Sequence, residues 1–146
     1  MMFFSKFQNL KGICLGTVML FLLTSCGSSF SAKDLAACDT AWSSTSNALF
    51  STPKAAYNDY APAPTYAEIS RHYEDLIDLK NELGDLAISV ENSDLKLALL
   101  DFSRGSQSMA SDFLANPLGK GTPGITQFNE TFKAVTELCK KSGWEN

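Results

Sequence analysis

TYAEISRHYEDLIDLKNELGDLAISVE, residues 65–91, contains the clearest helical pattern in this chain. Thr65 and Glu68 have the Thr-x-x-Glu spacing of a capping box, in which each side chain bonds to the backbone N–H of the other residue. Apolar residues then recur every three or four positions: Ile69, Tyr73, Leu76, Leu83, Leu86 or Ala87, and Val90. This period predicts one amphipathic helix from about residue 65 to 91. Lys80 interrupts the apolar stripe, and Gly84 costs the helix about 1 kcal/mol relative to alanine.

Three further segments show the same period. Residues 32–50 follow a Ser31 cap with Asp34 in the first turn, and their predicted inner face is Leu35, Cys38, Trp42, Thr45 and Leu49. Residues 94–115 follow a Ser93 cap, with Leu95, Ala98 or Leu99, Phe102, Gly105 or Ser106, Met109 and Phe113 inside. The small residues around Gly105 indicate either close approach of a neighbouring helix or a weak point.

The last helix begins at the pair Thr122-Pro123 and ends before Gly143, with Ile125, Phe128, Phe132, Val135 and Cys139 on one face. No segment alternates as a strand would. Four helices with one apolar face each predict an all-α domain over residues 31–146, folded as an up-down-up-down four-helix bundle.

The N-terminus has the pattern of an export signal. Lys6 and Lys11 precede an apolar run from Ile13 to Leu23, and small residues follow it. A membrane-spanning helix needs about 20 apolar residues, so this run is too short for one.

Leu23-Thr24-Ser25-Cys26 closes that run and resembles the lipobox of bacterial lipoproteins. The resemblance implies that residues 1–25 are a cleaved signal peptide and that the Cys26 thiol carries a diacylglycerol. Residues 26–30 would then be a short lipidated tether at the extracytoplasmic face of the cell membrane. The remaining domain is similar to small helical lipoproteins of actinobacteria, a likeness that brings no catalytic motif with it.

The chain has four cysteines; Cys14 is removed with the signal and Cys26 takes the lipid, which leaves Cys38 and Cys139. Outside the cytoplasm a single cysteine pair favours a disulfide over a metal site or a redox pair, and no Cys-x-x-Cys motif is present. In an up-down-up-down bundle the two residues lie on the apolar faces of the first and last helices at the same end. We therefore predict a disulfide between them.

The charge of the chain argues against nucleic acid as a partner. It has 12 basic and 16 acidic residues, and loss of Lys6 and Lys11 with the signal leaves 10 against 16, a net charge of about −6. Nucleic-acid affinity depends largely on contacts of lysine and arginine with phosphate. The protein would be held at the membrane through its N-terminal lipid.

Six acidic residues gather in the second helix: Glu68, Glu74, Asp75, Asp78, Glu82 and Asp85. This cluster indicates a solvated outer face or a patch for a basic partner or divalent cations.

No catalytic residues, metal ligands or cofactor site are predicted. The single histidine, His72, shares a helix face with Glu68 and Asp75, which we interpret as a solvated face because no second histidine is available for a metal pair. Tyr57 and Tyr60 lie in the proline-rich segment 51–64, where they either cap the core or form a binding loop.

The predicted function is a membrane-anchored, non-enzymatic binding module of the cell envelope. Its partner would be a protein, a polymer or a small apolar molecule. The alternatives are a structural or accessory subunit of a membrane or cell-wall complex and, third, an enzyme.

Overall fold

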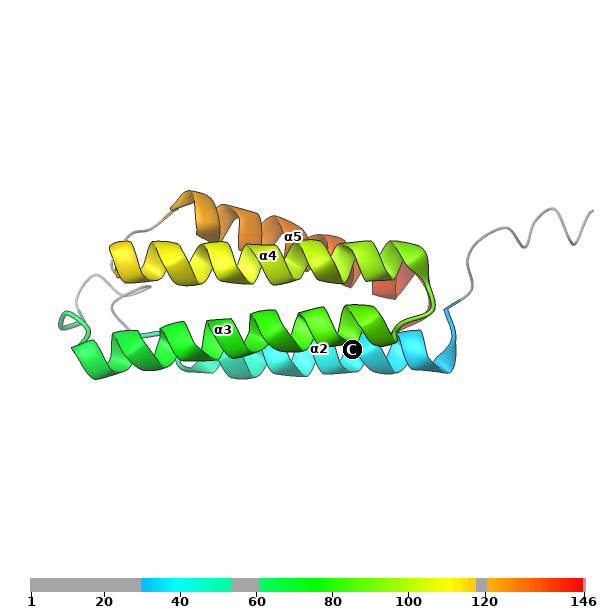
Figure 1. Ribbon diagram of the computed structural model, residues 1–146, viewed down its shortest axis with the longest axis horizontal. Coiled ribbons are helices and arrows are strands. Elements are labelled where there is room, and N and C mark those ends of the chain that lie inside the picture. Colours follow the sequence, from blue (N-terminus) through cyan, green and yellow to red (C-terminus); the bar gives the residue numbers. More distant parts are fainter. Residues whose placement is uncertain (1–29, 54–60, 118–120, 146) are drawn as a thin grey trace, which may run out of the picture.

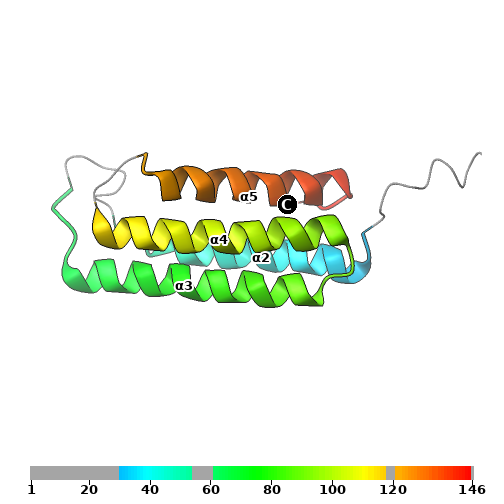
Figure 2. The same ribbon diagram turned by 45° about the horizontal axis from the view of Figure 1, so that its top comes forward.

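The computed structural model describes residues 30–53, 61–117 and 121–145, and these contain four α-helices. They are α2 (Ala32–Phe50), α3 (Tyr66–Ser89), α4 (Ser93–Ala115) and α5 (Pro123–Lys141). Each runs antiparallel to the next along one long axis (Figures 1 and 2). The predicted all-α, up-down-up-down bundle is confirmed. The predicted signal peptide, Cys26, residues 27–29 of the tether, and the pair Tyr57 and Tyr60 lie outside the described residues.

The bundle has two ends of different character. The start of α2, the α3–α4 turn and the end of α5 lie together at one end, which we call the N-terminal end (Figure 1). The end of α2, the start of α3, the end of α4 and the start of α5 form the opposite, distal end. None of the described helices is long and apolar enough to cross a bilayer.

Capping side chains determine where the helices begin. The Ser31 hydroxyl accepts the N–H of Asp34 at 3.2 Å, and the Asp34 carboxylate accepts the N–H of Ser31 at 2.9 Å. Thr65 and Glu68 form the predicted box in the same way, at 3.3 and 2.7 Å. Both boxes satisfy backbone donors that have no partner inside the helix.

Two predicted helix boundaries are wrong at the turn between α3 and α4. The helix α3 ends at Ser89 and not at 91, because Val90 adopts an extended conformation and its side chain is buried. The cap of α4 is Asn92 and not Ser93: its side-chain oxygen accepts the N–H groups of Asp94 and Leu95 at 3.0 and 2.9 Å. Asparagine is at least as strong a cap as serine, so α4 begins one residue early.

Aromatic rings fill the interface between α4 and α5. The Phe102 ring meets Phe128 edge-on at a centroid distance of 5.1 Å, and Phe132 lies 5.4 Å from Phe102. Gly105 lets the helices come this close, because a Cβ there would stand 2.5 Å from Thr131 Oγ1 and 3.2 Å from the Phe128 Cα. The predicted close approach at Gly105 is confirmed, and the neighbour is α5.

Helix α2 buries smaller side chains than predicted. Its buried positions are Asp34, Ala37, Cys38, Ala41, Thr45 and Ala48. Leu35 and Trp42 are half-buried and pack against the edge of the core, whereas Leu49 is exposed, so the predicted inner face is wrong at Leu49. Both candidate stripes have a helical period and share Cys38 and Thr45. The contacts of Asp34 and the disulfide rotate the helix so that the alanine stripe faces inward.

The disulfide between Cys38 and Cys139 joins α2 to α5, with the two Cα atoms 6.0 Å apart, and confirms the predicted link between the first and last helices. Trp144, just beyond α5, lies beside it and is almost fully buried. The Trp144 indole N–H donates to the Asp39 carboxylate at 2.6 Å, which adds a second connection between the C-terminal segment and α2.

Candidate binding site

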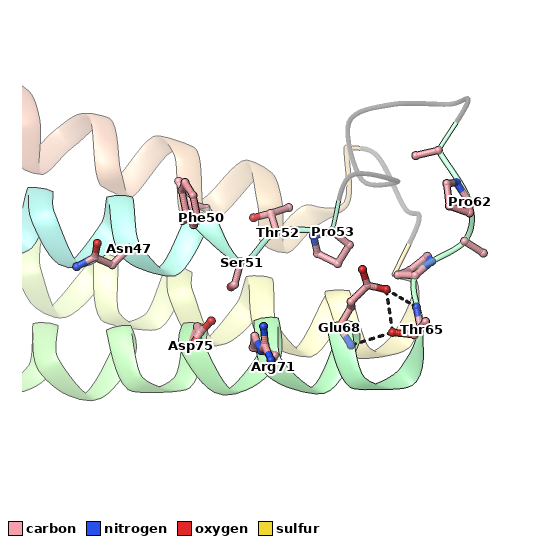
Figure 3. A pocket seen from close by; sticks show the side chains of 14 residues that line it. Asn47, Phe50, Ser51, Thr52, Pro53, Pro62, Thr65, Glu68, Arg71 and Asp75 are labelled. Carbon is pink, nitrogen blue, oxygen red and sulfur yellow. Dashed lines mark hydrogen bonds between the residues drawn. The ribbon is translucent and has the colours of Figure 1, made fainter.

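A hollow of about 1080 Å³ lies at the distal end, where the chain passes from α2 to α3 (Figure 3). Its apolar wall consists of Leu49, Phe50, Pro53, Ala61, Pro62, Ala63 and Pro64. Its polar wall consists of Asn47, Ser51, Thr52, Thr65, Glu68, Arg71 and Asp75. We call it the distal hollow. Figure 3 shows that α2 supplies Asn47 and Phe50 on one side and α3 supplies Arg71 and Asp75 on the other.

Proline and an exposed aromatic ring give the apolar wall its character. Pro53, Pro62 and Pro64 lie in non-helical backbone, as expected for a residue that interrupts helices, and this backbone borders the hollow. Phe50 ends α2 with 93% of its surface exposed, and Tyr66 begins α3 with 83% exposed. Rings that contribute so little to the core leave a large apolar area free for contact with another molecule.

The charged wall is anionic at neutral pH apart from Arg71. Backbone and side-chain hydrogen bonds from Thr65 lower the pKa of Glu68, and the positive charge of Arg71 lowers it further. The Glu68 carboxylate accepts the Thr65 N–H at 2.7 Å and its hydroxyl at 2.8 Å. Glu68 therefore holds the start of α3 while keeping its charge in the hollow.

His72 lies behind this wall, fully buried, and the prediction of a solvated His72 is wrong. Its Nδ1 lies 3.1 Å from Ser51 Oγ, its Nε2 lies 3.5 Å from Thr52 Oγ1, and its ring meets Phe113 edge-on at 4.6 Å. The Ser51 hydroxyl donates to the Ala48 carbonyl, so its oxygen accepts from Nδ1–H, which leaves Nε2 to accept from Thr52. The prediction failed because the hydroxyls that satisfy the ring come from the end of α2, some 20 residues away in sequence.

Burial sets the charge of this histidine. It lowers the pKa of His72, and the negative charge of Asp75 and the Ala48 carbonyl offset that effect only in part. The ring is thus neutral at pH 7 and joins the end of α2 to α3. The structure assigns it a structural role beneath the hollow.

A second hollow of about 380 Å³ continues along the line between α2 and α3. Its α2 side is formed by Thr40, Ser43, Ser44, Asn47 and Ala48, and its α3 side by Asp75, Asp78, Leu79 and Glu82. Asn47 and Asp75 line both hollows, so the two lie next to each other along the same line. We call the combined feature the α2/α3 trough.

The trough divides the acidic residues of α3 into two sets. Glu68, Asp75, Asp78 and Glu82 line it, whereas Glu74 and Asp85 are exposed elsewhere on the helix. Among the described residues no group of three or more His, Cys, Asp or Glu side chains is arranged to hold a metal ion, and Glu68, His72 and Asp75 do not form one.

The α2 wall was not predicted from the sequence. Ser43, Ser44 and Asn47 lie between the predicted apolar positions of the first helix, and Phe50 lies at its end. The available signal was a polar stripe of small side chains beside an apolar residue at the helix end. Comparison with protein-family models, with curated proteins and with solved structures finds no match for this chain.

Proposed function

We propose that this protein is a lipid-anchored lipoprotein of the bacterial cell envelope that binds a partner through its distal end without performing chemistry on it. The lipobox-like stretch ending at Cys26 supplies the anchor, and the disulfide fits an oxidising compartment. Two acyl chains are enough for stable attachment, whereas one holds only marginally.

The main support for this proposal is that the chain enters the bundle at one end and the hollow lies at the other. The chain enters the bundle at the start of α2, only a few residues after Cys26. The distal hollow and the exposed Phe50 lie at the other end of α2 (Figure 1). At 1.5 Å per residue, the 19-residue helix holds the hollow about 28 Å from that entry point. A lipid at the N-terminal end would leave the distal end free to meet a partner.

The chemistry of the hollow supports binding over catalysis. The two groups most suited to proton transfer are already engaged: Glu68 is hydrogen-bonded to Thr65, and both His72 nitrogens face hydroxyl groups of the two residues that follow α2. A general acid or base needs to reach a substrate proton within about 3 Å. Contact through apolar and charged surfaces is the activity that remains.

The anchor is tested by Cys26→Ser in the native host. We expect loss of acylation and of normal signal cleavage, read by intact mass and by partition into the detergent phase. Acyl mass and detergent partition that survive the substitution would disprove the lipobox interpretation. The Cys38 and Cys139 pair offers an internal control, because its disulfide should form in either protein.

The binding end is tested by photo-crosslinking in intact cells. A photoreactive amino acid at Phe50 is compared with one at Ile88, which is 76% exposed at the N-terminal end. We expect discrete adducts from position 50 and none, or only lipid, from position 88. Protein adducts from position 88 alone would contradict the distal site and favour an accessory subunit packed against a membrane complex.

A further inference from the structure

We propose that the α2/α3 trough binds an extended basic polypeptide segment, with an apolar side chain in the distal hollow and lysine or arginine side chains along α3. The proposal rests on the proposed binding function and names the class of partner. It follows from the shape of the trough, the direction of its hydrogen-bonding groups and the order of its charges.

The two walls run side by side for most of the length of α2. Glu68, Arg71, Asp75, Asp78 and Glu82 follow one another at spacings of three and four, which places them on one face of α3. The 14-residue offset from Glu68 to Glu82 corresponds to about 21 Å. An extended chain of about six residues covers that length.

Thr40 and Ser43 on one wall and the carboxylates on the other present hydrogen-bond acceptors to the inner part of the trough. The Thr40 hydroxyl donates to the Ala36 carbonyl and the Ser43 hydroxyl to the Thr40 carbonyl, each at 3.0 Å, so their oxygens keep only lone pairs for a ligand. The carboxylates opposite accept and cannot donate when ionised. A lysine ammonium has three donors and a guanidinium has five, so basic side chains satisfy both walls together.

The charges are ordered along the trough. Arg71 is the one basic residue among the described residues that line it, and it belongs to the distal hollow, whose apolar wall includes Phe50 and the prolines. There Arg71 offsets part of the negative charge of Glu68 and Asp75, so a basic ligand residue gains less than it does farther along the trough, and the apolar wall accommodates an apolar residue. Beyond Arg71, the carboxylates of Asp75, Asp78 and Glu82 follow, and within the described residues no lysine or arginine pairs with Asp78 or Glu82.

The spacing suits alternate residues of an extended chain. Asp75 to Asp78 and Asp78 to Glu82 are about 4.5 and 6 Å apart along the helix axis. Side chains on one side of an extended chain recur about every 6.6 Å. A sequence of one aromatic residue followed by lysine at alternate positions therefore places its ring at the distal hollow and its ammonium groups near the carboxylates.

The test measures binding of a labelled peptide, Phe-Ser-Lys-Ser-Lys-Ser, and of its reversed sequence, to the full chain in detergent by fluorescence anisotropy. We expect one direction to bind and the affinity to fall with added salt. Replacing both lysines by glutamate should abolish binding, and replacing the phenylalanine by serine should weaken it. Spermidine serves as a polycation without an apolar group.

Matched variants identify the trough. Asp78→Asn with Glu82→Gln should weaken binding about five- to tenfold, as loss of two partly screened charge pairs predicts. Glu74→Gln with Glu130→Gln removes two charges from exposed positions outside the trough, on α3 and α5, and should change binding less than about twofold. Phe50→Ser should weaken binding, and Leu114→Ser, at an exposed apolar position near the same end, should not.

Three results would overturn the proposal. The first is a lysine peptide that binds no better than the glutamate peptide. The second is equal weakening by the two charge-removing pairs, which would mean non-specific attraction. The third is spermidine binding as tightly as the peptide with no effect of Phe50→Ser, which would make the ligand a plain polycation. Crosslinks from Phe50 in cells without peptide binding would leave the binding function standing and refute only this partner class.

Discussion

Asp34 is the polar group on which the attachment of α2 depends most. Only 1% of it is exposed, yet its carboxylate accepts four hydrogen bonds. One oxygen accepts the N–H and the hydroxyl of Ser31 at 2.9 and 3.0 Å, and the other accepts the N–H groups of Glu91 and Asn92 at 2.8 and 3.1 Å. The first pair is a local cap, whereas the second pair joins the start of α2 to the α3–α4 turn.

Asp34→Asn should lower the free energy of unfolding by about 3 kcal/mol, because two hydrogen bonds to a charged acceptor contribute at least about 1.5 kcal/mol each. The amide retains one acceptor oxygen and turns an N–H donor toward backbone N–H donors. Glu68→Gln is the matched control: it alters the same kind of capping box on α3, where the hydrogen bonds that the carboxylate accepts within the described part of the chain come from Thr65. Its effect should be clearly smaller. Urea unfolding followed by circular dichroism, with the disulfide intact, gives both values.

The pH dependence supplies an independent check. Burial alone would raise the pKa of Asp34, but the hydrogen bonds from Ser31, Asn92 and Glu91 outweigh burial and lower it. The stabilisation by the carboxylate is therefore complete above the unfolded pKa of about 3.9 and is lost as pH falls through the lower folded pKa. Asp34→Asn should lack this part of the acid unfolding. Equal losses for Asp34→Asn and Glu68→Gln at neutral pH would refute the link to the α3–α4 turn.

Three further predictions concern the disulfide, the buried histidine and two glycines. Replacing Cys38 and Cys139 by alanine should lower the free energy of unfolding by about 4–5 kcal/mol, the chain-entropy value for a separation of 101 residues. A loss below about 1 kcal/mol in urea unfolding would contradict this expectation. Because burial lowers the pKa of His72 in the folded state, stability should be full above the unfolded pKa of about 6.5 and fall as pH drops through the folded pKa. His72→Gln should flatten that fall in urea midpoints measured across this range, and an unchanged slope would assign it to other groups. Gly105→Ala should destabilise the protein by about 1–3 kcal/mol, because the new Cβ meets Thr131 and Phe128. Gly84→Ala should stabilise it by up to about 1 kcal/mol, because no atom lies within 4 Å of the new Cβ. Thermal midpoints of the two variants that shift in the same direction would contradict this account of the packing.

Hydrophobic period and capping residues were enough to predict the bundle. The spacing from Ile125 to Cys139 and the Thr65–Glu68 box depend on contacts within one helix, so the sequence contains them directly. The disulfide followed from topology once the helices and export were assumed. These inferences need no knowledge of which side chain meets which across the bundle.

The candidate site could not be predicted because it depends on the rotation of α2. Two stripes of that helix satisfy the helical period, one with Leu35, Trp42 and Leu49 and one with alanines. The choice between them is made by partners far along the chain, Glu91 and Asn92 for Asp34 and Cys139 for Cys38. The same rotation brings Ser43 and Asn47 opposite the acidic face of α3 and turns Ser51 toward His72.

The distribution of contacts along α2 explains why a trough exists at all. Three strong links hold its first part: Asp34 to the α3–α4 turn, Cys38 to Cys139, and Asp39 to Trp144. Farther along, α2 faces α3 with hydroxyl, amide and alanine side chains, which are too small to fill the space that aromatic rings fill between α4 and α5. Larger apolar side chains at Ser43, Ser44 and Asn47 would close the trough and would bury more apolar surface. The observed composition forgoes that stabilisation, and the disulfide and the Asp34 contacts at the N-terminal end compensate for it while leaving the surface between α2 and α3 open to a ligand.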